Sequence, residues 1–162
     1  MRVVFSSLVF IALAASSYVT AKGINCQGSS DCFFFSNPDN PNQSIADSLH
    51  QEIAAHVDDN RWYQNGEHIV CVDGEVRVFP FTDFGSICAF LQNTWGLPGS
   101  VIKTLSQRIV EHGCSKCGSV PAFFDQGDND IKSHGELTFN FVNRVEGGDG
   151  QCGSIPGKCQ YD

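Results

Sequence analysis

The residues in this chain most able to do chemistry are its eight cysteines. Two of them, Cys114 and Cys117, are separated by only Ser115 and Lys116. A C-x-x-C pair of this kind can be a redox-active dithiol, half of a zinc site, or two members of different disulfides. No second close pair is present to complete a zinc site. The remaining cysteines are Cys26, Cys32, Cys71, Cys88, Cys152 and Cys159.

The first 21 residues are typical of a secretory signal peptide. Arg2 provides the basic start, residues 3–15 are largely apolar, and Val19 and Ala21 are small residues before a cleavage site. The apolar stretch is short for a membrane span. We therefore expect cleavage after Ala21 and a secreted mature chain, residues 22–162, that forms a single domain.

Secretion changes how the cysteines are interpreted, because disulfides persist in an oxidising compartment. All eight cysteines lie in the mature chain, and their number is even. This favours four structural disulfides over a redox or zinc site. The count alone does not choose among the many pairings that eight cysteines allow.

The composition excludes several classes of partner. The chain has 10 basic and 18 acidic residues, a formal net charge of −8. Nucleic acid is therefore not expected as a partner, because phosphate binding requires clustered Lys and Arg. Electrostatic attachment to anionic membranes is disfavoured for the same reason. Outside the signal peptide no stretch is long and apolar enough to cross a bilayer, so we expect no stable membrane insertion.

The five histidines and the acidic residues do not form a catalytic or metal-binding motif. His50 and His56 are six residues apart in a predicted helix, a spacing that does not place two ligands on one face. Residues 125–130 are acidic but lack the spacing and the late glutamate of a calcium loop. No nucleophile elbow, phosphate loop or zinc-protease motif is present. We therefore predict no catalytic residue, no metal site and no cofactor.

Three segments have clear periodic patterns. Apolar residues recur every four positions over residues 45–57, after Ser44, which is a suitable helix N-cap. A second amphipathic helix is predicted from residue 99 onwards, ending at Gly113, which suits a left-handed C-cap. Residues 136–142 alternate between apolar and polar, as a half-buried strand does.

A hairpin is predicted between the two helices. The β-branched runs at residues 68–72 and 75–79 flank Asp73-Gly74, which favours a two-residue turn. Pro80 ends the second strand or confines it to an edge, and Ser86 is predicted to cap a short helix through residue 91. These elements predict an α+β fold in which two main helices pack on one face of a mostly antiparallel sheet.

Three blocks of sequence resemble the KP-four-type fungal killer toxin family. They are GINCQGSSDC at residues 23–32, HGCSKCGS followed by Pro121 at residues 112–119, and GELTFNFVN at residues 135–143. The blocks occur in the family's order and span almost the whole mature chain. The resemblance implies a small α/β sandwich, stapled by disulfides, in which an antiparallel sheet carries two main helices.

The resemblance also implies part of the disulfide pairing. By analogy, Cys26 pairs with Cys114 and Cys32 pairs with Cys117. These two bridges would fasten the N-terminal segment to the end of the second helix.

The remaining cysteines depart from the family pattern. The type toxin has ten cysteines, and two of its bridges have no counterpart here; Tyr63 occupies one of the vacant places. This chain has Cys88 and an additional tail cysteine instead. We therefore expect Cys71 and Cys88 to pair with Cys152 and Cys159, in an order that stays open.

The resemblance implies a toxin that kills competing cells by inhibiting calcium channels. In the family this activity is attributed to an exposed lysine shortly before the cysteine that matches Cys71. Here residues 66–70 contain no Lys or Arg, and Ile69 falls where that lysine aligns. His68 is the nearest group that can become cationic. Arg77, on the predicted partner strand, is the replacement cation that we would test first.

Phe33, Phe34 and Phe35 form an unusual aromatic run. Packing in the core is one interpretation, and an exposed patch for a partner or a membrane surface is the other. Together with His68 and Arg77, these phenylalanines are our candidate target-binding residues.

We therefore expect a secreted, monomeric killer-toxin-like protein or effector that acts without catalysis on a surface target of another cell, with an ion channel as one candidate. The alternative is a carbohydrate- or cell-wall-active protein, or a hydrolase, on the same scaffold. A hydrolase requires convergent carboxylates or a histidine in a concave pocket, whereas a blocker requires a projecting surface. Asn42 begins the one Asn-x-Ser/Thr sequon and is the predicted glycosylation site.

Overall fold

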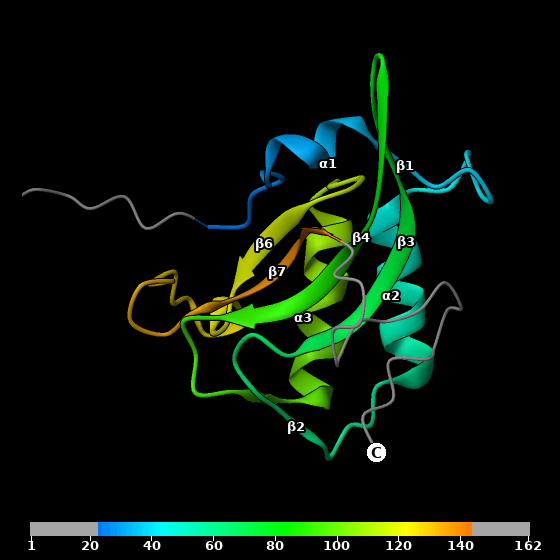
Figure 1. Ribbon diagram of the computed structural model, residues 1–162. Coiled ribbons are helices and arrows are strands. Elements are labelled where there is room, and N and C mark those ends of the chain that lie inside the picture. The colour runs from blue at the N-terminus through cyan, green and yellow to red at the C-terminus, as the bar shows by residue number, and fades with distance from the viewer. Residues whose placement is uncertain (1–22, 144–162) are drawn as a thin grey trace, which may run out of the picture.

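A computed structural model describes residues 23–143 (Figure 1). The predicted signal peptide and the last two cysteines lie outside these residues. The helices are α1 (Ser30–Phe34), α2 (Ile45–His56) and α3 (Gly99–Glu111), with a 3₁₀ turn at Phe124–Gln126. The strands are β1 (Phe35–Ser36), β2 (Trp62–Tyr63), β3 (His68–Val78), β4 (Phe81–Gln92), β5 (Leu97–Pro98), β6 (Gly118–Pro121) and β7 (Glu136–Asn143).

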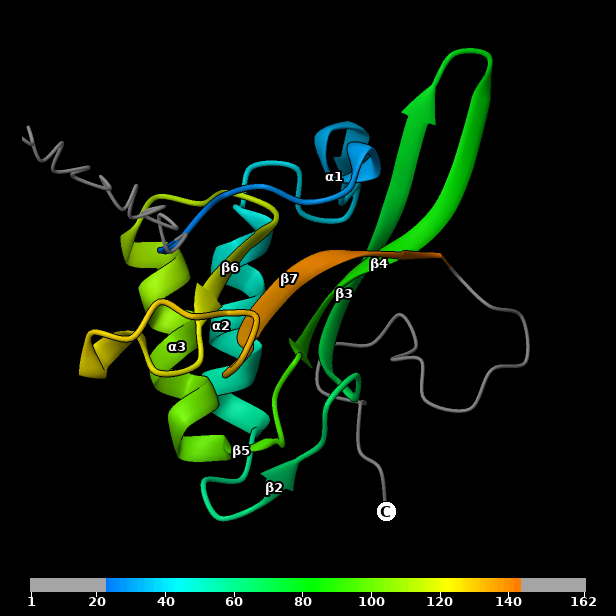
Figure 2. The same cartoon turned by 90° about the vertical axis from the view of Figure 1, so that its left-hand side faces the viewer.

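Five of the strands form one antiparallel sheet, in the order β1–β3–β4–β7–β6. Helices α2 and α3 contact each other and cover one face of this sheet (Figure 2). Strands β2 and β5 form a separate two-stranded ribbon. The predicted α+β architecture, with two main helices on one face of an antiparallel sheet, is confirmed.

One end of each main helix has the capping residue that the sequence predicts. The hydroxyl of Ser44 accepts a hydrogen bond from the backbone N–H of Asp47 at 3.2 Å, which satisfies one of the free donors at the start of α2. Helix α3 ends at Glu111, and Gly113 follows the cap residue His112 in the left-handed region with a φ of 93°. Gly113 thus has the left-handed conformation that was predicted for the end of this helix.

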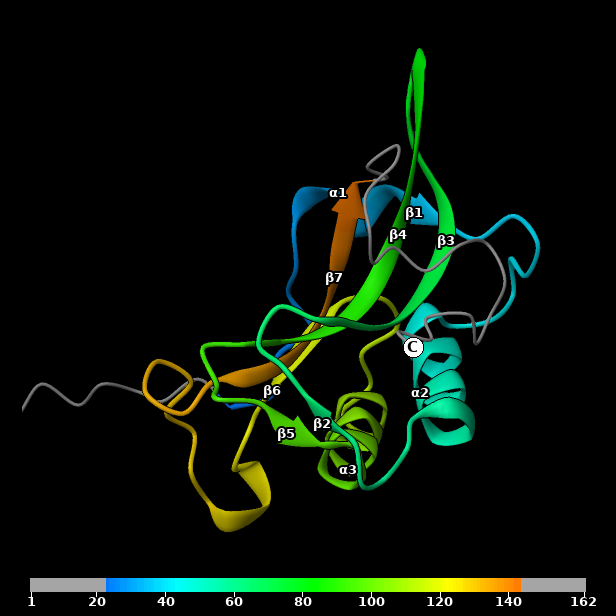
Figure 3. The same ribbon diagram turned by 60° about the horizontal axis from the view of Figure 1, so that its bottom comes forward.

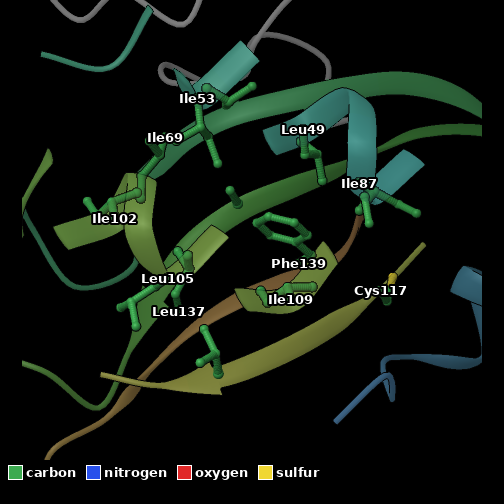
Figure 4. Packing of buried hydrophobic residues seen from close by; sticks show 14 of the residues in the cluster. Leu49, Ile53, Ile69, Ile87, Ile102, Leu105, Ile109, Cys117, Leu137 and Phe139 are labelled. Carbon is green, nitrogen blue, oxygen red and sulfur yellow. The ribbon is translucent and has the colours of Figure 1, made fainter. Parts of the chain in front are cut away.

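The hydrophobic core lies between the two helices and the sheet (Figure 4). Burial of such apolar side chains is the main favourable contribution to folding. Phe139 of β7 is among the largest fully buried side chains, and it lies close to residues of both helices. The other buried residues labelled there include Leu49 and Ile53 of α2, Ile102, Leu105 and Ile109 of α3, Ile87 of β4 and Leu137 of β7.

The predicted turn at Asp73-Gly74 is wrong. Strand β3 runs through both residues, and the chain reverses at Phe79-Pro80, which is joined by a cis peptide bond. Gly74 does not have the positive φ that a type I′ turn requires. A glycine is required at position 74 for another reason. A Cβ there would lie 2.3 Å from the carbonyl oxygen of Ser36 in the neighbouring strand.

The short helix predicted up to residue 91 is also wrong, because these residues belong to β4. This strand lies between β3 and β7, and its inner half has the buried residues Ile87, Cys88, Ala89 and Leu91. Ile87 and Ala89 face the helices, whereas Cys88 packs on the other face with Phe90. A short apolar run without alternation fits either a buried strand or a helix, and here tertiary packing decides.

Two disulfides fasten the N-terminal segment to the rest of the molecule. Cys26 is bonded to Cys114, which follows α3, and Cys32 is bonded to Cys117, which precedes β6. These are the two pairs that the family resemblance implies. Each bridge closes a loop of more than eighty residues, the kind of loop for which a bridge restricts the unfolded chain most.

The third disulfide corrects an expectation. Cys71 of β3 and Cys88 of β4 lie directly opposite each other in the strand register and are bonded to one another. The expected pairing of these two residues with Cys152 and Cys159 is therefore wrong. The two C-terminal cysteines lie outside the described residues.

We predict that digestion of the unreduced protein releases two peptides linked through Cys71 and Cys88, because the β3–β4 register holds these residues opposite each other. Mass spectrometry before and after reduction identifies the linked pair. The peptides joined through Cys32 and Cys117 are the internal control. A link from Cys71 to either C-terminal cysteine would contradict the pairing.

Candidate functional site

The most prominent surface feature is the outer end of the β3–β4 hairpin, residues 77–84, which we call the arm. It extends beyond the rest of the described chain in all three views (Figures 1, 2 and 3). Strand β1 pairs with β3 only as far as Val76, and β7 pairs with β4 only from Gly85. Within residues 23–143 the arm is thus a two-stranded ribbon without neighbouring strands, and all of its residues are exposed.

The tip of the arm, residues 78–81, is entirely apolar, with the sequence Val-Phe-Pro-Phe. Phe79 at the turn is 98% exposed and Phe81 is 71% exposed. The nearest charged residues along the chain are Arg77 on one strand and Asp83 on the other. Most proteins bury side chains of this size, so the tip is a candidate interaction surface.

Aromatic side chains fix the base of the arm. Gly74 and Gly85 are opposite each other in the ribbon, and neither leaves room for a Cβ. The ring of Phe35 lies against Gly74 and the ring of Phe141 lies against Gly85. The two rings are 6.0 Å apart in an edge-on arrangement, which is favourable for aromatic pairs. This packing holds the ribbon at the point where it leaves the sheet.

The three adjacent phenylalanines have different environments. Phe33 and Phe34 in α1 are exposed, whereas Phe35 is 1% exposed and belongs to the core. The Nζ of Lys116 donates hydrogen bonds to the carbonyl oxygens of Phe33 and Phe35, at 2.9 and 2.8 Å, and so holds this segment in place. The prediction that Phe35 contacts a target is therefore wrong. Phe33 and Phe34 remain available, and α1 contacts β3 near the base of the arm.

His68 and Arg77 are at opposite ends of β3, and the structure does not bring them together. They were expected on two strands of one hairpin, but the turn lies further along the chain. His68 is partly buried beside the ring of Phe90. Arg77 lies on the arm, forms a salt bridge with Glu75, and has a side chain that is 67% exposed.

Two other cations, Arg61 and Lys103, are less accessible than Arg77. The side chain of Arg61 is 33% exposed and pairs with Glu67. The side chain of Lys103 is 28% exposed and pairs with Asp59. Arg77 is therefore the most exposed cation of the three, and it is the one that the arm presents to solvent.

Histidine and cysteine side chains come together at two places among residues 23–143. Each group contains two cysteines whose sulfur atoms are bonded to one another. A disulfide sulfur is not the thiolate that binds metal, so neither group has the ligands of a metal site. The groups are Cys26, His112 and Cys114, and His68, Cys71 and Cys88.

The acidic loop that follows the 3₁₀ turn is held by its own hydrogen bonds. Asp128 pairs with His134, and Asp125 pairs with an arginine of α3. The backbone N–H and the side chain of Ser133 donate to Asp130, which holds the pKa of this carboxyl below its usual value. The three carboxylates are directed to different partners rather than to a common centre.

A hollow of about 290 Å³ lies at the end of the molecule opposite the arm. Its rim includes Trp62 beside β5 and Trp95 before it, which are 53% and 92% exposed. Phe123 and His134 complete one side, with their rings 5.8 Å apart. The lining is largely apolar, as in pockets that bind small ligands.

Carboxylates line a second hollow, of about 400 Å³, between α2 and β3. Asp39, Glu52 and Asp73 contribute to its walls. The Oε2 of Glu52 lies 3.3 Å from the Nε2 of His56, one turn along α2, and the two form an ion pair when the histidine is protonated. Asp73 accepts a hydrogen bond from Ser86, whereas the buried Oε2 of Glu52 makes no hydrogen bond.

Comparison with known proteins decides the family. The family model described as Kp4 matches residues 9–143. The chain is also 30% identical over 143 residues to the KP4 killer toxin of Ustilago maydis P4 virus, which covers 88% of this chain and 95% of that toxin. This protein belongs to the Kp4 killer toxin family. The family resemblance identified from three sequence blocks is confirmed.

For a Kp4 family member, the position of Ile69 is informative. Its side chain is 3% exposed and belongs to the core, where a register irregularity occurs between His68 and Val70. The residue aligned with the family's lysine therefore points into the protein. A lysine placed at this position would enter the core rather than project towards a target.

Sequence reasoning missed four of the exposed aromatic residues: Phe79, Phe81, Trp62 and Trp95. Phe79 and Phe81 were assigned to the end of a strand and to the segment after it, although the Phe-Pro-Phe run is itself a signal of an apolar turn. Trp62 and Trp95 are more than thirty residues apart in the chain. Only the pairing of β2 with β5 brings them to one hollow.

We predict that Ile69→Lys destabilises the protein by about 3 kcal/mol or more, because a charged amine would be buried without a partner. Urea unfolding monitored by circular dichroism measures the effect. The matched control is Ile69→Val, which keeps the site apolar and should cost only about 1 kcal/mol. A stable Ile69→Lys variant would show that residue 69 reaches solvent.

Proposed function

We propose that this Kp4 family protein is secreted and acts as a toxin or effector on other cells, by binding a surface target without catalysing a reaction. The observation that carries the proposal is the arm, a projecting ribbon with an exposed apolar tip and one exposed cation. Its fixed base supports this role, because a preorganised element loses little conformational freedom on binding.

Binding is favoured over hydrolysis by the placement of the acidic and basic groups. The arm carries no pair of titratable groups around a concave site. The arm therefore has the composition of a binding surface rather than of a catalytic centre.

Inhibition of a calcium channel is the specific mechanism that the family suggests. The cation that serves it in our proposal is Arg77, since a basic side chain can compete with cations for carboxylates at a pore. Two features oppose strong inhibition. Glu75 neutralises much of the charge of Arg77, and the net charge of −8 works against approach to an acidic pore. We therefore expect inhibition that is weaker than that of basic family members.

A second candidate function is binding of cell-wall carbohydrate. The hollow between Trp62 and Trp95 favours it, because flat aromatic side chains with nearby polar groups suit the apolar faces and hydroxyls of sugar rings. Thr94, Gln126 and His134 supply polar atoms at this site. This surface is separate from the arm.

We predict that the oxidised protein inhibits growth of susceptible fungal cells and that Arg77→Ala raises the half-inhibitory concentration severalfold. The loss reflects removal of the exposed cation of the arm, and added calcium should relieve inhibition if a calcium channel is blocked. Gln107→Ala, on the exposed face of α3, is the control. Equal potency of the Arg77 and Gln107 variants would exclude Arg77 from the target contact.

We predict that the protein is retained on insoluble chitin or β-glucan if the second function is correct, and that Trp95→Ala reduces retention about tenfold by removing a stacking surface. Pull-down with washed polysaccharide measures retention. Arg77→Ala is the control here, because the arm lies at the other end of the molecule. Retention that is unaffected by Trp95→Ala would remove this candidate.

A further inference from the structure

We propose that the tip of the arm, residues 78–81, docks into the interfacial region of a lipid bilayer. The inference rests on the proposed function, since it names the partner that the arm meets first. Its chemical class is an uncharged or zwitterionic membrane surface, contacted reversibly by a few aromatic side chains.

The shape of the arm supports a bilayer as its partner. The ribbon is convex and narrow, and it projects beyond both α1 and the sheet (Figures 1 and 2). A convex apolar element needs either a matching groove or a deformable apolar medium. The tip concentrates its apolar surface at the outermost turn, where Phe79 is almost fully exposed.

The chemistry of the tip fits the boundary between headgroups and acyl chains. Phe79 and Phe81 offer two rings, and Pro80 between them has no backbone N–H that would need a partner in an apolar medium. Peripheral membrane elements commonly bury such residues only several ångströms deep.

The neighbouring residues limit the depth of insertion. Arg77 lies opposite Thr82, one step from the tip, and Asp83 follows, so polar and charged groups encircle the ribbon. The outer backbone edges of a two-stranded ribbon also need water or another hydrogen-bond partner, which the hydrocarbon core does not provide. The tip can therefore enter the interface but the ribbon cannot span the membrane. Among residues 23–143, no helix is long and apolar enough to cross a membrane.

The charge of the chain favours a bilayer over a second copy of the protein. Two copies with a net charge of −8 repel one another, whereas a zwitterionic bilayer does not repel an acidic protein. Helix α1, which carries the exposed residues Phe33 and Phe34, lies at the same end of the molecule as the arm (Figure 2).

Binding to vesicles should depend on the charge of the lipid. Because insertion is driven by apolar contact, binding to phosphatidylcholine should be insensitive to salt. Phosphatidylserine should weaken binding at low salt, since the acidic chain is repelled, and added salt should restore it. A protein held by electrostatic attraction would instead bind phosphatidylserine more strongly than phosphatidylcholine, and added salt would weaken its binding.

Vesicle flotation with the full-length secreted, oxidised protein tests the proposal. Wild-type protein should float with phosphatidylcholine vesicles, and the double change Phe79→Ala with Phe81→Ala should reduce the partition coefficient at least about tenfold. Phe79→Trp should retain binding, and its fluorescence should shift to the blue on contact with vesicles. Trp95→Ala, which removes an equally exposed aromatic ring at the far end, should bind as wild type does.

Three results would overturn the inference. They are no flotation of the wild-type protein, equal flotation of the double variant, or a larger loss with Trp95→Ala than with the double variant. Light scattering without vesicles adds a fourth, because tip-dependent dimers would assign the tip to a second copy. Growth inhibition by the same variants separates the two proposals. If the double variant loses inhibition while no protein floats, the arm still binds a target but that target is not the lipid.

Discussion

Strands β3 and β4 pair from His68–Phe90 near the helices to Val78–Phe81 at the outer turn, with one irregularity between His68 and Val70, and both the core and the arm depend on this pairing. The inner half of the ribbon carries Ile87, Ala89 and Leu91, which are fully buried. The outer half has no neighbouring strand among the described residues. The backbone hydrogen bonds between β3 and β4 thus hold the arm rigidly to the packed sheet, although the arm itself makes no core contacts. The Cys71–Cys88 bridge joins the two strands on the face away from the helices.

Much of this architecture follows from local sequence. The four-residue apolar period and the Ser44 cap predict α2, the apolar stripe and Gly113 predict α3, and strict alternation predicts β7. The position of the hairpin turn does not follow from local sequence. Asp73-Gly74 has the sequence of a turn, but a glycine is needed there for packing between strands. Gly74 is small so that the backbone of β1 and the ring of Phe35 can pack against β3. Only the three-dimensional contact distinguishes the two uses of glycine.

The candidate site was only partly predictable for similar reasons. The chemistry of Phe33 and Phe35 is identical, yet one is exposed and the other is buried, because α1 ends between them and the extended backbone of β1 turns Phe35 towards the sheet. Arg77 is exposed, but it lies on the first strand of the hairpin and not on the second, where it was expected. Its part in target binding stays a prediction. The aromatic tip was not recognised because the turn was placed too early, which put Phe79 at a strand end instead of at the outermost point of the chain.

The arm also poses a stability problem that its sequence addresses. A two-stranded ribbon with apolar ends exposes backbone edges on which other chains can pair. Here the charged residues Arg77 and Asp83 flank the tip, and Pro80 interrupts the donors at the turn. The apolar surface is thereby confined to the few residues that a partner can cover. Exposed aromatic rings add no hydrophobic free energy to folding. The stability of the protein must therefore come from the core and from the disulfides that fix the N-terminal segment. A surface maintained at that cost is more consistent with recognition of another cell than with a structural role, and its distance from the Trp62–Trp95 hollow leaves both ends of the molecule free to act at the same time.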